Sequence, residues 1–224
     1  KEALKAFFKE NVKPNYLRFD SLQDKLDYLL ENNYIEKGFL NKYSYEFVIK
    51  LFKFVYSKDF RFKSFMAAYK FYSQYAMKTN DNTKYLESFE DRVAFNALYF
   101  ANGDEELAWS LADELINQRY QPATPSFLNA GRARRGEFIS CFLLDVTDDM
   151  NSIGRSINSA LQLSKLGGGV GINLSNIREA GASIKGYEGA ASGVVPIMKM
   201  LEDSFSYANQ LGQRQGAGAV YLNV

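Results

Sequence analysis

The spacing of apolar residues changes near Gln121, and this change divides the sequence into two parts that must fold differently. Up to about residue 118, apolar side chains recur three and four positions apart, which predicts a series of helices. Helices are expected after Ser21, after Ser44, over 65–75, after Ser88 and over 104–117. We therefore expect a helical domain at residues 1–118.

Beyond Gln121, short apolar runs alternate with helical segments. Strands are expected at 138–146, 170–174 and 219–224, separated by helices at 149–165 and 193–209, the second of them capped by Ser192. This β-α-β-α-β order is typical of a mostly parallel sheet or barrel, so residues 119–224 are expected to form an α/β domain.

The two prolines and the first apolar run of this second part predict local structure. Pro122 and Pro125 predict an extended or turn segment, because a proline disfavours helical backbone in the residue before it. The strand expected at 138–146 is apolar on both faces, which favours a buried position.

The charge balance and the missing residue types exclude several functions. The 27 basic and 26 acidic side chains nearly cancel, so neither nucleic acid nor a membrane is expected as a partner. There is no histidine, which excludes Ser-His, Cys-His and His-zinc mechanisms from this sequence, and no metal site is expected. A single cysteine fits a reducing compartment, and without a signal peptide or membrane-spanning run we expect a cytoplasmic protein. A lysine at the start and a predicted strand at the end indicate a piece of a longer protein.

Cys141 and the glycine-rich run that follows it are the first candidates for chemistry. The cysteine is either a small buried core residue or a redox or radical thiol, because sulfur gives up an electron or hydrogen atom readily. The run 167–171 contains four glycines, whereas one would be enough to connect a helix to a strand. The surplus indicates that a ligand approaches the backbone closely.

Two loops flank the helix expected at 193–209 and carry cations among small residues. Loop 176–186 contains Arg178 and Lys185, and loop 210–218 contains Arg214 and three glutamines. Each loop alone is more typical of a solvated surface, but the pair together suits the phosphates and base edges of a nucleotide.

Two charged clusters have a structural and a functional interpretation. Asp148 and Asp149 are by default a helix cap followed by a first-turn acid. The basic run of Arg132, Arg134 and Arg135 is expected to be a solvated loop, with phosphate contact as the alternative.

Four motifs in order resemble the large catalytic subunit of ribonucleotide reductase: TPSFLNAG at 124–131, ISCFL at 139–143, LGGGVGIN at 166–173 and IREAG at 177–181. The resemblance extends from about Ser88 to the end of the sequence. It implies an amino-terminal helical domain followed by the first part of a ten-stranded α/β barrel. Too few residues come before it for a full ATP-cone module, which resembles the class Ib form.

The resemblance also implies roles for individual residues. Cys141 matches the cysteine that reduces the substrate at C2′ and becomes half of a disulfide. Thr124, Ser140 and the backbone of Gly168 and Gly169 match substrate-contacting positions.

A second group of residues matches the allosteric machinery of that family. Asp148, Arg178 and Lys185 match the specificity site, where a deoxynucleotide or ATP binds with Mg, and Arg214 matches the loop that passes its signal to the substrate. The helices expected at 149–165 and 193–209 match those that pair across a homodimer.

The implied reaction reduces ribonucleoside diphosphates by thiyl-radical chemistry. It implies a small subunit that supplies a metal-tyrosyl radical (dimanganese or diiron) and a thioredoxin- or glutaredoxin-like reductant, with no cofactor covalently bound here. The family's radical-forming cysteine, its second disulfide cysteine and its acid/base glutamate have no counterparts and are expected past Val224, so this segment alone should not turn over. Two alternatives stay open: an adenosylcobalamin-dependent class II reductase, and a non-catalytic deoxynucleotide-binding dimerisation module.

Overall fold

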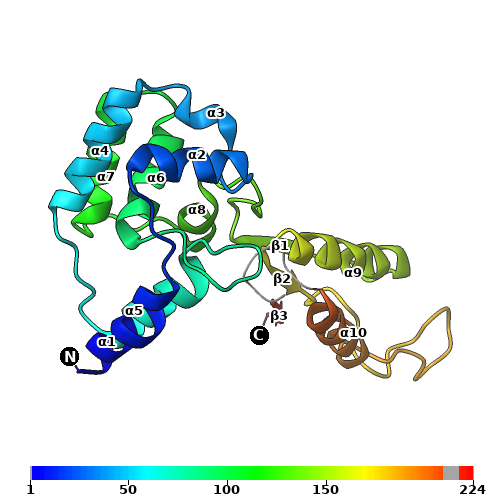
Figure 1. Cartoon of the computed structure of the whole chain (residues 1–224). Helices are drawn as coiled ribbons and strands as arrows, with labels where there is room; N and C mark the ends of the chain where they lie inside the picture. Colours follow the sequence, from blue (N-terminus) through cyan, green and yellow to red (C-terminus); the bar gives the residue numbers. More distant parts are fainter. Residues whose placement is uncertain (1, 209–216, 224) are drawn as a thin grey trace. The chain divides into compact units, whose positions relative to one another are not determined.

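The computed structural model describes residues 2–208 and 217–223 of the chain. The chain divides into two compact units, Lys1–Arg134 and Arg135–Val224, which are described here one at a time. The first is helical and the second contains a parallel sheet, as the change of spacing near Gln121 predicts (Figure 1).

Turns and longer loops join the helices of the first unit, with an extended segment between α4 and α5 (Figure 1). Its α-helices are α1 (Glu2–Phe7), α2 (Leu22–Glu31), α3 (Lys37–Leu40), α4 (Tyr45–Ser57), α5 (Phe65–Lys70), α6 (Phe89–Ala101), α7 (Glu105–Ile116) and α8 (Thr124–Asn129). A π-helix, Phe8–Val12, and a 3-10 turn, Lys13–Asn15, continue α1, and a second π-helix, Phe71–Tyr75, continues α5.

Side-chain caps fix where most of the longer helices of this unit begin. Five cap residues each accept a hydrogen bond from the backbone N–H three positions later: Ser21, Ser44, Ser64, Ser88 and Asp104. At α6 the cap is reciprocal, because the Asp91 carboxylate also accepts from the Ser88 N–H at 2.7 Å. The helix starts expected after Ser21, Ser44 and Ser88 are therefore confirmed.

Helix α6 forms the centre of the core in this unit. It packs against α4 and α7 and is buried around much of its circumference, with Val93, Ala94, Phe95, Ala97 and Leu98 inaccessible to solvent. Aromatic rings fill the space beside it; Phe60 stacks on Phe89 with ring centroids 4.1 Å apart. The abundant aromatic residues are mainly core, and such pairs add to the stability gained from burial.

The extended or turn segment expected at 122–125 is confirmed for Pro122 and Ala123, which precede α8, and is wrong for Thr124 and Pro125, which form its first turn. Pro125 occupies one of the first two positions of this helix, where its missing N–H breaks no intrahelical hydrogen bond. The proline pattern therefore marks a helix start and not a turn.

Side chains of α6 hold the backbone at the end of α8. Asn96 Nδ2 donates to the Phe127 carbonyl at 3.0 Å, and the Arg92 guanidinium donates to the carbonyls of Leu128 and Ala130. These bonds attach the segment around α8 to the helical unit. The compact units accordingly divide at 134/135, whereas the sequence-based division lies at 118/119.

In the second unit, three parallel strands alternate with two helices within the described residues. The elements are β1 (Cys141–Asp145), α9 (Met150–Lys165), β2 (Gly169–Asn173), α10 (Val195–Tyr207) and β3 (Gly218–Tyr221). The strand order is β1-β2-β3, with Cys141 opposite Gly169 and Val170 opposite Gly218. The expected β-α-β-α-β order is confirmed, although α10 begins after Val194 and not after Ser192.

One face of this sheet packs against the helices. Val170 and Ile172 of β2 form a core with Ile197, Leu201 and Phe205 of α10. The other face is open: Leu143 of β1 is 82% exposed. The expectation of a strand buried on both faces is therefore wrong for β1, because α9 and α10 cover only one side.

Among the described residues, no helix combines the length and apolar character needed to cross a membrane.

Candidate functional site

The open face of the sheet carries a shallow hollow of about 250 Å³ that contains the thiol. It is lined by Cys141, Leu143, Gly169, Val170, Gly171, Ala217, Gly218, Ala219 and Tyr221. Cys141 is the first residue of β1 and is a free, exposed thiol. The structure thus excludes the interpretation of Cys141 as a buried core residue.

Three glycines of the run after α9 can each be explained by local structure. Gly167 has a φ of +98°, the left-handed backbone that ends α9. A Cβ on Gly168 would lie 2.2 Å from the Phe142 ring, and one on Gly171 would lie 2.9 Å from Leu143. Packing accounts for these three positions without a ligand.

Gly169 is the glycine whose surroundings leave room for a ligand. A Cβ added there would meet only the Ser140 carbonyl oxygen, at an ordinary 3.6 Å. Its N–H donates to that same oxygen at 2.8 Å and fixes the backbone beside Cys141. The run therefore leaves room for a ligand at one position, Gly169, and not along its whole length.

Of the five residues expected to contact substrate, Ser140, Cys141, Gly168 and Gly169 lie together at the adjoining ends of β1 and β2. Thr124 belongs to the first unit, where it occupies the first turn of α8. Its hydroxyl lies 3.1 Å from that of Tyr75.

Asp148 and Arg178, expected at an effector site, do meet. Arg178 Nε donates to Asp148 Oδ2 at 2.5 Å, and Arg178 Nη1 donates to the Ser183 carbonyl at 3.1 Å. This arrangement ties the loop after β2 to the segment that follows β1. The pair is partly exposed, so a bound anion can reach the guanidinium.

The cap of α9 is Asp149, and the default assignment of the cap to Asp148 is wrong. Asp149 accepts from the Ser152 N–H at 2.8 Å and from the Thr147 hydroxyl at 2.7 Å. The Thr147 hydrogen bond, followed by that from Ser152, lowers the pKa of Asp149 below its usual value. Asp148 is thereby left to pair with Arg178.

Among the described residues, Lys185, also expected at the effector site, forms no hydrogen bond or ion pair with Asp148 or Arg178. Lys185 and Gly186 form the tip of a tight turn between Ile184 and Tyr187, with φ values of +52° and +85°. Arg214 lies outside the described residues.

The basic run at 132–135 is only partly a solvated loop. Arg132 is 8% exposed, and its Nη2 donates to Glu87 at 2.9 Å and to the Tyr75 carbonyl. Arg134 is exposed and contacts Asn80, and the Arg135 guanidinium lies 4.5 Å from the centroid of the Phe138 ring. The expectation of a solvated loop is wrong for Arg132.

Sequence reasoning missed the buried cluster that Arg132 enters. Arg92 Nη1 lies 3.1 Å from Glu87, so one carboxylate serves two guanidinium groups. Burial lowers the pKa of Arg92 to about 10, opposed by the attraction of Glu87. Glu87 and Arg92 lie close in the sequence, but Arg132 is 45 residues from Glu87, so no local signal could have identified the cluster.

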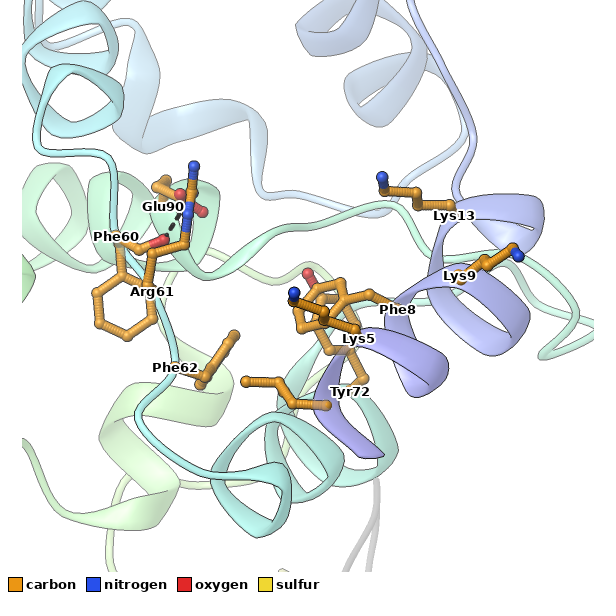
Figure 2. Close-up of a pocket in the computed structure, with 10 residues that line it drawn as sticks. Lys5, Phe8, Lys9, Lys13, Phe60, Arg61, Phe62, Tyr72 and Glu90 are labelled. Atoms are coloured by element: carbon orange, nitrogen blue, oxygen red, sulfur yellow. Dashed lines mark hydrogen bonds between the residues drawn. The ribbon is translucent and has the colours of Figure 1, made fainter. Parts of the chain in front are cut away.

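The first unit also contains a larger hollow, of about 660 Å³, that sequence analysis did not predict. Figure 2 shows Arg61 and Glu90 on one side of it and Lys5, Lys9 and Lys13 on the other. Its apolar lining is Leu4, Phe8, Phe60, Phe62 and Tyr72. Burial raises the pKa of the Glu90 carboxyl above its usual value.

Within residues 2–208 and 217–223, no group of three or more Asp, Glu or Cys side chains is placed to hold a metal ion.

Three models of protein families together match nearly the whole chain. Residues 1–60 match the ribonucleotide reductase N-terminal model, residues 61–135 the ribonucleotide reductase all-alpha domain, and residues 139–224 the ribonucleotide reductase barrel domain. The chain belongs to the ribonucleotide reductase family. Its helical unit and its three-stranded sheet correspond to the all-alpha domain and the start of the barrel domain.

Curated relatives support this membership along the full chain. The ribonucleoside-diphosphate reductase subunit alpha of Bacillus subtilis is 55% identical over 224 residues, which is 100% of this chain and 32% of that protein. The subunit of the same name from Mycoplasma pneumoniae is 54% identical over 99% of this chain and 31% of its own length. The chain therefore spans about a third of the length of these relatives.

Proposed function

We propose that this chain is part of the alpha subunit of a ribonucleoside-diphosphate reductase of the class Ib kind. The observation that carries the proposal is the free thiol of Cys141, exposed at the start of β1 and beside the unobstructed backbone of Gly169. The family membership and the names of the relatives support the same reaction. A reactive thiol has to be reachable by the substrate, and this one is.

Cys141 supplies one of the two thiols that the reaction oxidises. The substrate loses its 2′-hydroxyl as water and gains hydrogen at C2′, while two thiols lose two electrons and two protons and form a disulfide. The sequence contains a single cysteine, so the second thiol comes from a residue outside it. The radical that starts the reaction comes from a small subunit with a dimanganese or diiron centre, and a thioredoxin- or glutaredoxin-like protein reduces the disulfide again.

Ser140, Gly168 and Gly169 form the part of the substrate site beside the thiol. Thr124, which belongs to the first unit, matches a substrate-contacting position of the family and is proposed to contact substrate through its hydroxyl. The Gly169 N–H is already used by the Ser140 carbonyl, so the contribution of Gly169 is the absence of a side chain. The substrate is a ribonucleoside diphosphate, and a free thiol agrees with a cytoplasmic location.

The specificity effector, a deoxynucleotide or ATP with Mg, binds near Asp148 and Arg178. The observed ion pair places a cation and a carboxylate on one surface, where the cation suits phosphate and the carboxylate suits a hydroxyl or a metal ion. Lys185 and Arg214 belong to this site in the proposal, and helices α9 and α10 pair across a homodimer.

The test is turnover by the full-length subunit with its radical-generating partner, comparing the native protein with Cys141→Ser. We expect the variant to lose multiple turnover and to keep its affinity for the effector, because the substituted atom is the reductant. Normal multiple turnover by the variant would refute the assignment. A requirement for adenosylcobalamin in place of the small subunit would instead identify the class II reductase, and effector binding by a native protein that never turns over would identify the non-catalytic module.

A second measurement isolates the effector site. Calorimetry with Asp148→Ala is expected to show altered affinity for the deoxynucleotide, because the substitution frees Arg178 from its ion pair. Unchanged affinity counts against the site.

A further inference from the structure

We propose that Tyr75 is a positioning residue for the substrate site: its hydroxyl orients the hydroxyl of Thr124 so that Thr124 donates its hydrogen to the substrate. The inference rests on the proposed function, in which Thr124 contacts substrate. It assigns a role to a residue that lies in no sequence motif and comes from a different part of the helical unit.

Tyr75 is held at three points. It is the last residue of the π-helix Phe71–Tyr75, and its carbonyl accepts a hydrogen bond from Arg132 Nη2. Its ring packs against that of Phe127, with centroids 5.8 Å apart. Within the described part of the chain, its hydroxyl has one hydrogen-bond partner, Thr124 Oγ1 at 3.1 Å.

The backbone that carries Thr124 is equally fixed. Asn96 holds the Phe127 carbonyl at 3.0 Å, and Arg92 holds the carbonyl of Ala130. Both donors are buried side chains of α6. The backbone around Thr124 is therefore held in place by hydrogen bonds. What these bonds do not determine is the direction in which the Thr124 hydroxyl hydrogen points.

The relative acidity of the two hydroxyls decides that direction. Either oxygen can donate in this pair on geometry alone. A phenol is the stronger acid and so the better donor, and the favoured arrangement has Tyr75 donating to Thr124 Oγ1. Thr124 has a single hydroxyl hydrogen, which then points away from Tyr75. Thr124 is half-buried, so this hydrogen can reach an acceptor oxygen of a ligand, such as a phosphate or ribose oxygen.

The test is a double-mutant cycle on the full-length subunit with its partner, using Tyr75→Phe, Thr124→Val and the pair together. Tyr75→Phe keeps the ring and removes only the hydroxyl. We expect it to raise KM for the nucleoside diphosphate about three- to tenfold, the worth of one hydrogen bond, with kcat little changed. In the Thr124→Val background the same substitution is expected to have no further effect on KM.

Two controls separate positioning from loss of stability. Tyr43→Phe removes a hydroxyl that donates to the Leu98 carbonyl at 2.8 Å in the same unit, so it lowers Tm but leaves KM unchanged. Thr124→Ser keeps a hydroxyl at this position. In that background, Tyr75→Phe is therefore expected to raise KM as it does in the native protein.

The outcomes distinguish this inference from the function on which it rests. If Thr124→Val raises KM and Tyr75→Phe does not, positioning by Tyr75 is refuted and the substrate role of Thr124 stands. If the two effects on KM simply add, the coupling is absent and the inference is also refuted. If Thr124→Val leaves KM unchanged, the substrate role of Thr124 fails, and the inference fails with it.

Discussion

The two units of this chain differ in how completely their central elements are buried. In the first unit, helix α6 is enclosed by other helices, and even its charged residues Asp91 and Arg92 are buried with partners. In the second, the sheet is covered on one face, while Leu143 and Tyr221 lie on the other, exposed. The difference shows that the first unit uses its polar side chains to hold backbone in place, whereas the second leaves one face of its sheet, with the Cys141 thiol, accessible to solvent.

The largest expected effect tests the buried charges of the first unit. Glu87→Ala leaves Arg92 and Arg132 without their shared carboxylate, so we expect the free energy of unfolding to fall by about 3–5 kcal/mol. Urea denaturation followed by circular dichroism measures it. The matched control is Asp59→Asn, which removes the charge of an exposed pair with Arg61, keeps a side chain that tolerates the left-handed backbone of this position, and is expected to cost less than about 1 kcal/mol. Equal losses in the two variants would contradict the contrast between buried and exposed pairs.

The next effect tests the two faces of the sheet in the second unit. Leu201→Ala removes a side chain that is 1% exposed in the core between α10 and the sheet, at an expected cost of about 2–4 kcal/mol. Leu143→Ala changes the open face and is expected to cost less than about 0.5 kcal/mol, which the same denaturation experiment measures. A large loss for Leu143→Ala would show that this face is covered in the protein studied.

A smaller effect tests the reciprocal cap of α6. Ser88→Ala removes the acceptor of the Asp91 N–H, with an expected loss of about 1 kcal/mol, seen as a lower Tm. Ser44→Ala at α4 is the matched control, because that cap accepts from Phe47 without a reciprocal carboxylate. The loss at Ser88 should be the larger of the two; the reverse order would argue against cooperation within the capping box.

The smallest effect concerns pH and the hollow of Figure 2. The folded-state pKa of Glu90 is raised by burial, so folding favours its neutral form. The stability that this form contributes is complete below the unfolded-state pKa and is lost as pH rises through the folded-state pKa. Glu90→Gln is therefore expected to raise Tm slightly at neutral pH, with the gain disappearing near about pH 4. A gain that grows towards low pH would contradict the sign of the shift.

Local chemistry made the helical starts predictable, because Ser21, Ser44 and Ser88 cap through neighbours three residues away. The order of strands and helices in the second unit was predictable for the same reason, since apolar spacing is a local property. The proposed roles of Cys141, Thr124 and the effector residues came from motif resemblance and stay predictions.

Tertiary contacts explain what the sequence could not show. The burial of Arg132 depends on Glu87, 45 residues away, and nothing near either residue encodes the pairing. The exposure of β1 depends on which face α9 and α10 cover, and an apolar run is compatible with either outcome. The attachment of the helix at 124–129 to α6 depends on donors from Arg92 and Asn96, which the proline pattern does not reveal.

The contact between Gly168 and Phe142 restricts how this sequence can change over time. Because a Cβ at 168 would lie 2.2 Å from the ring, a larger residue there requires the Phe142 ring to move away or to be replaced by a smaller side chain. The two positions are therefore expected to be coupled, so that a substitution at 168 is tolerated better when residue 142 is small.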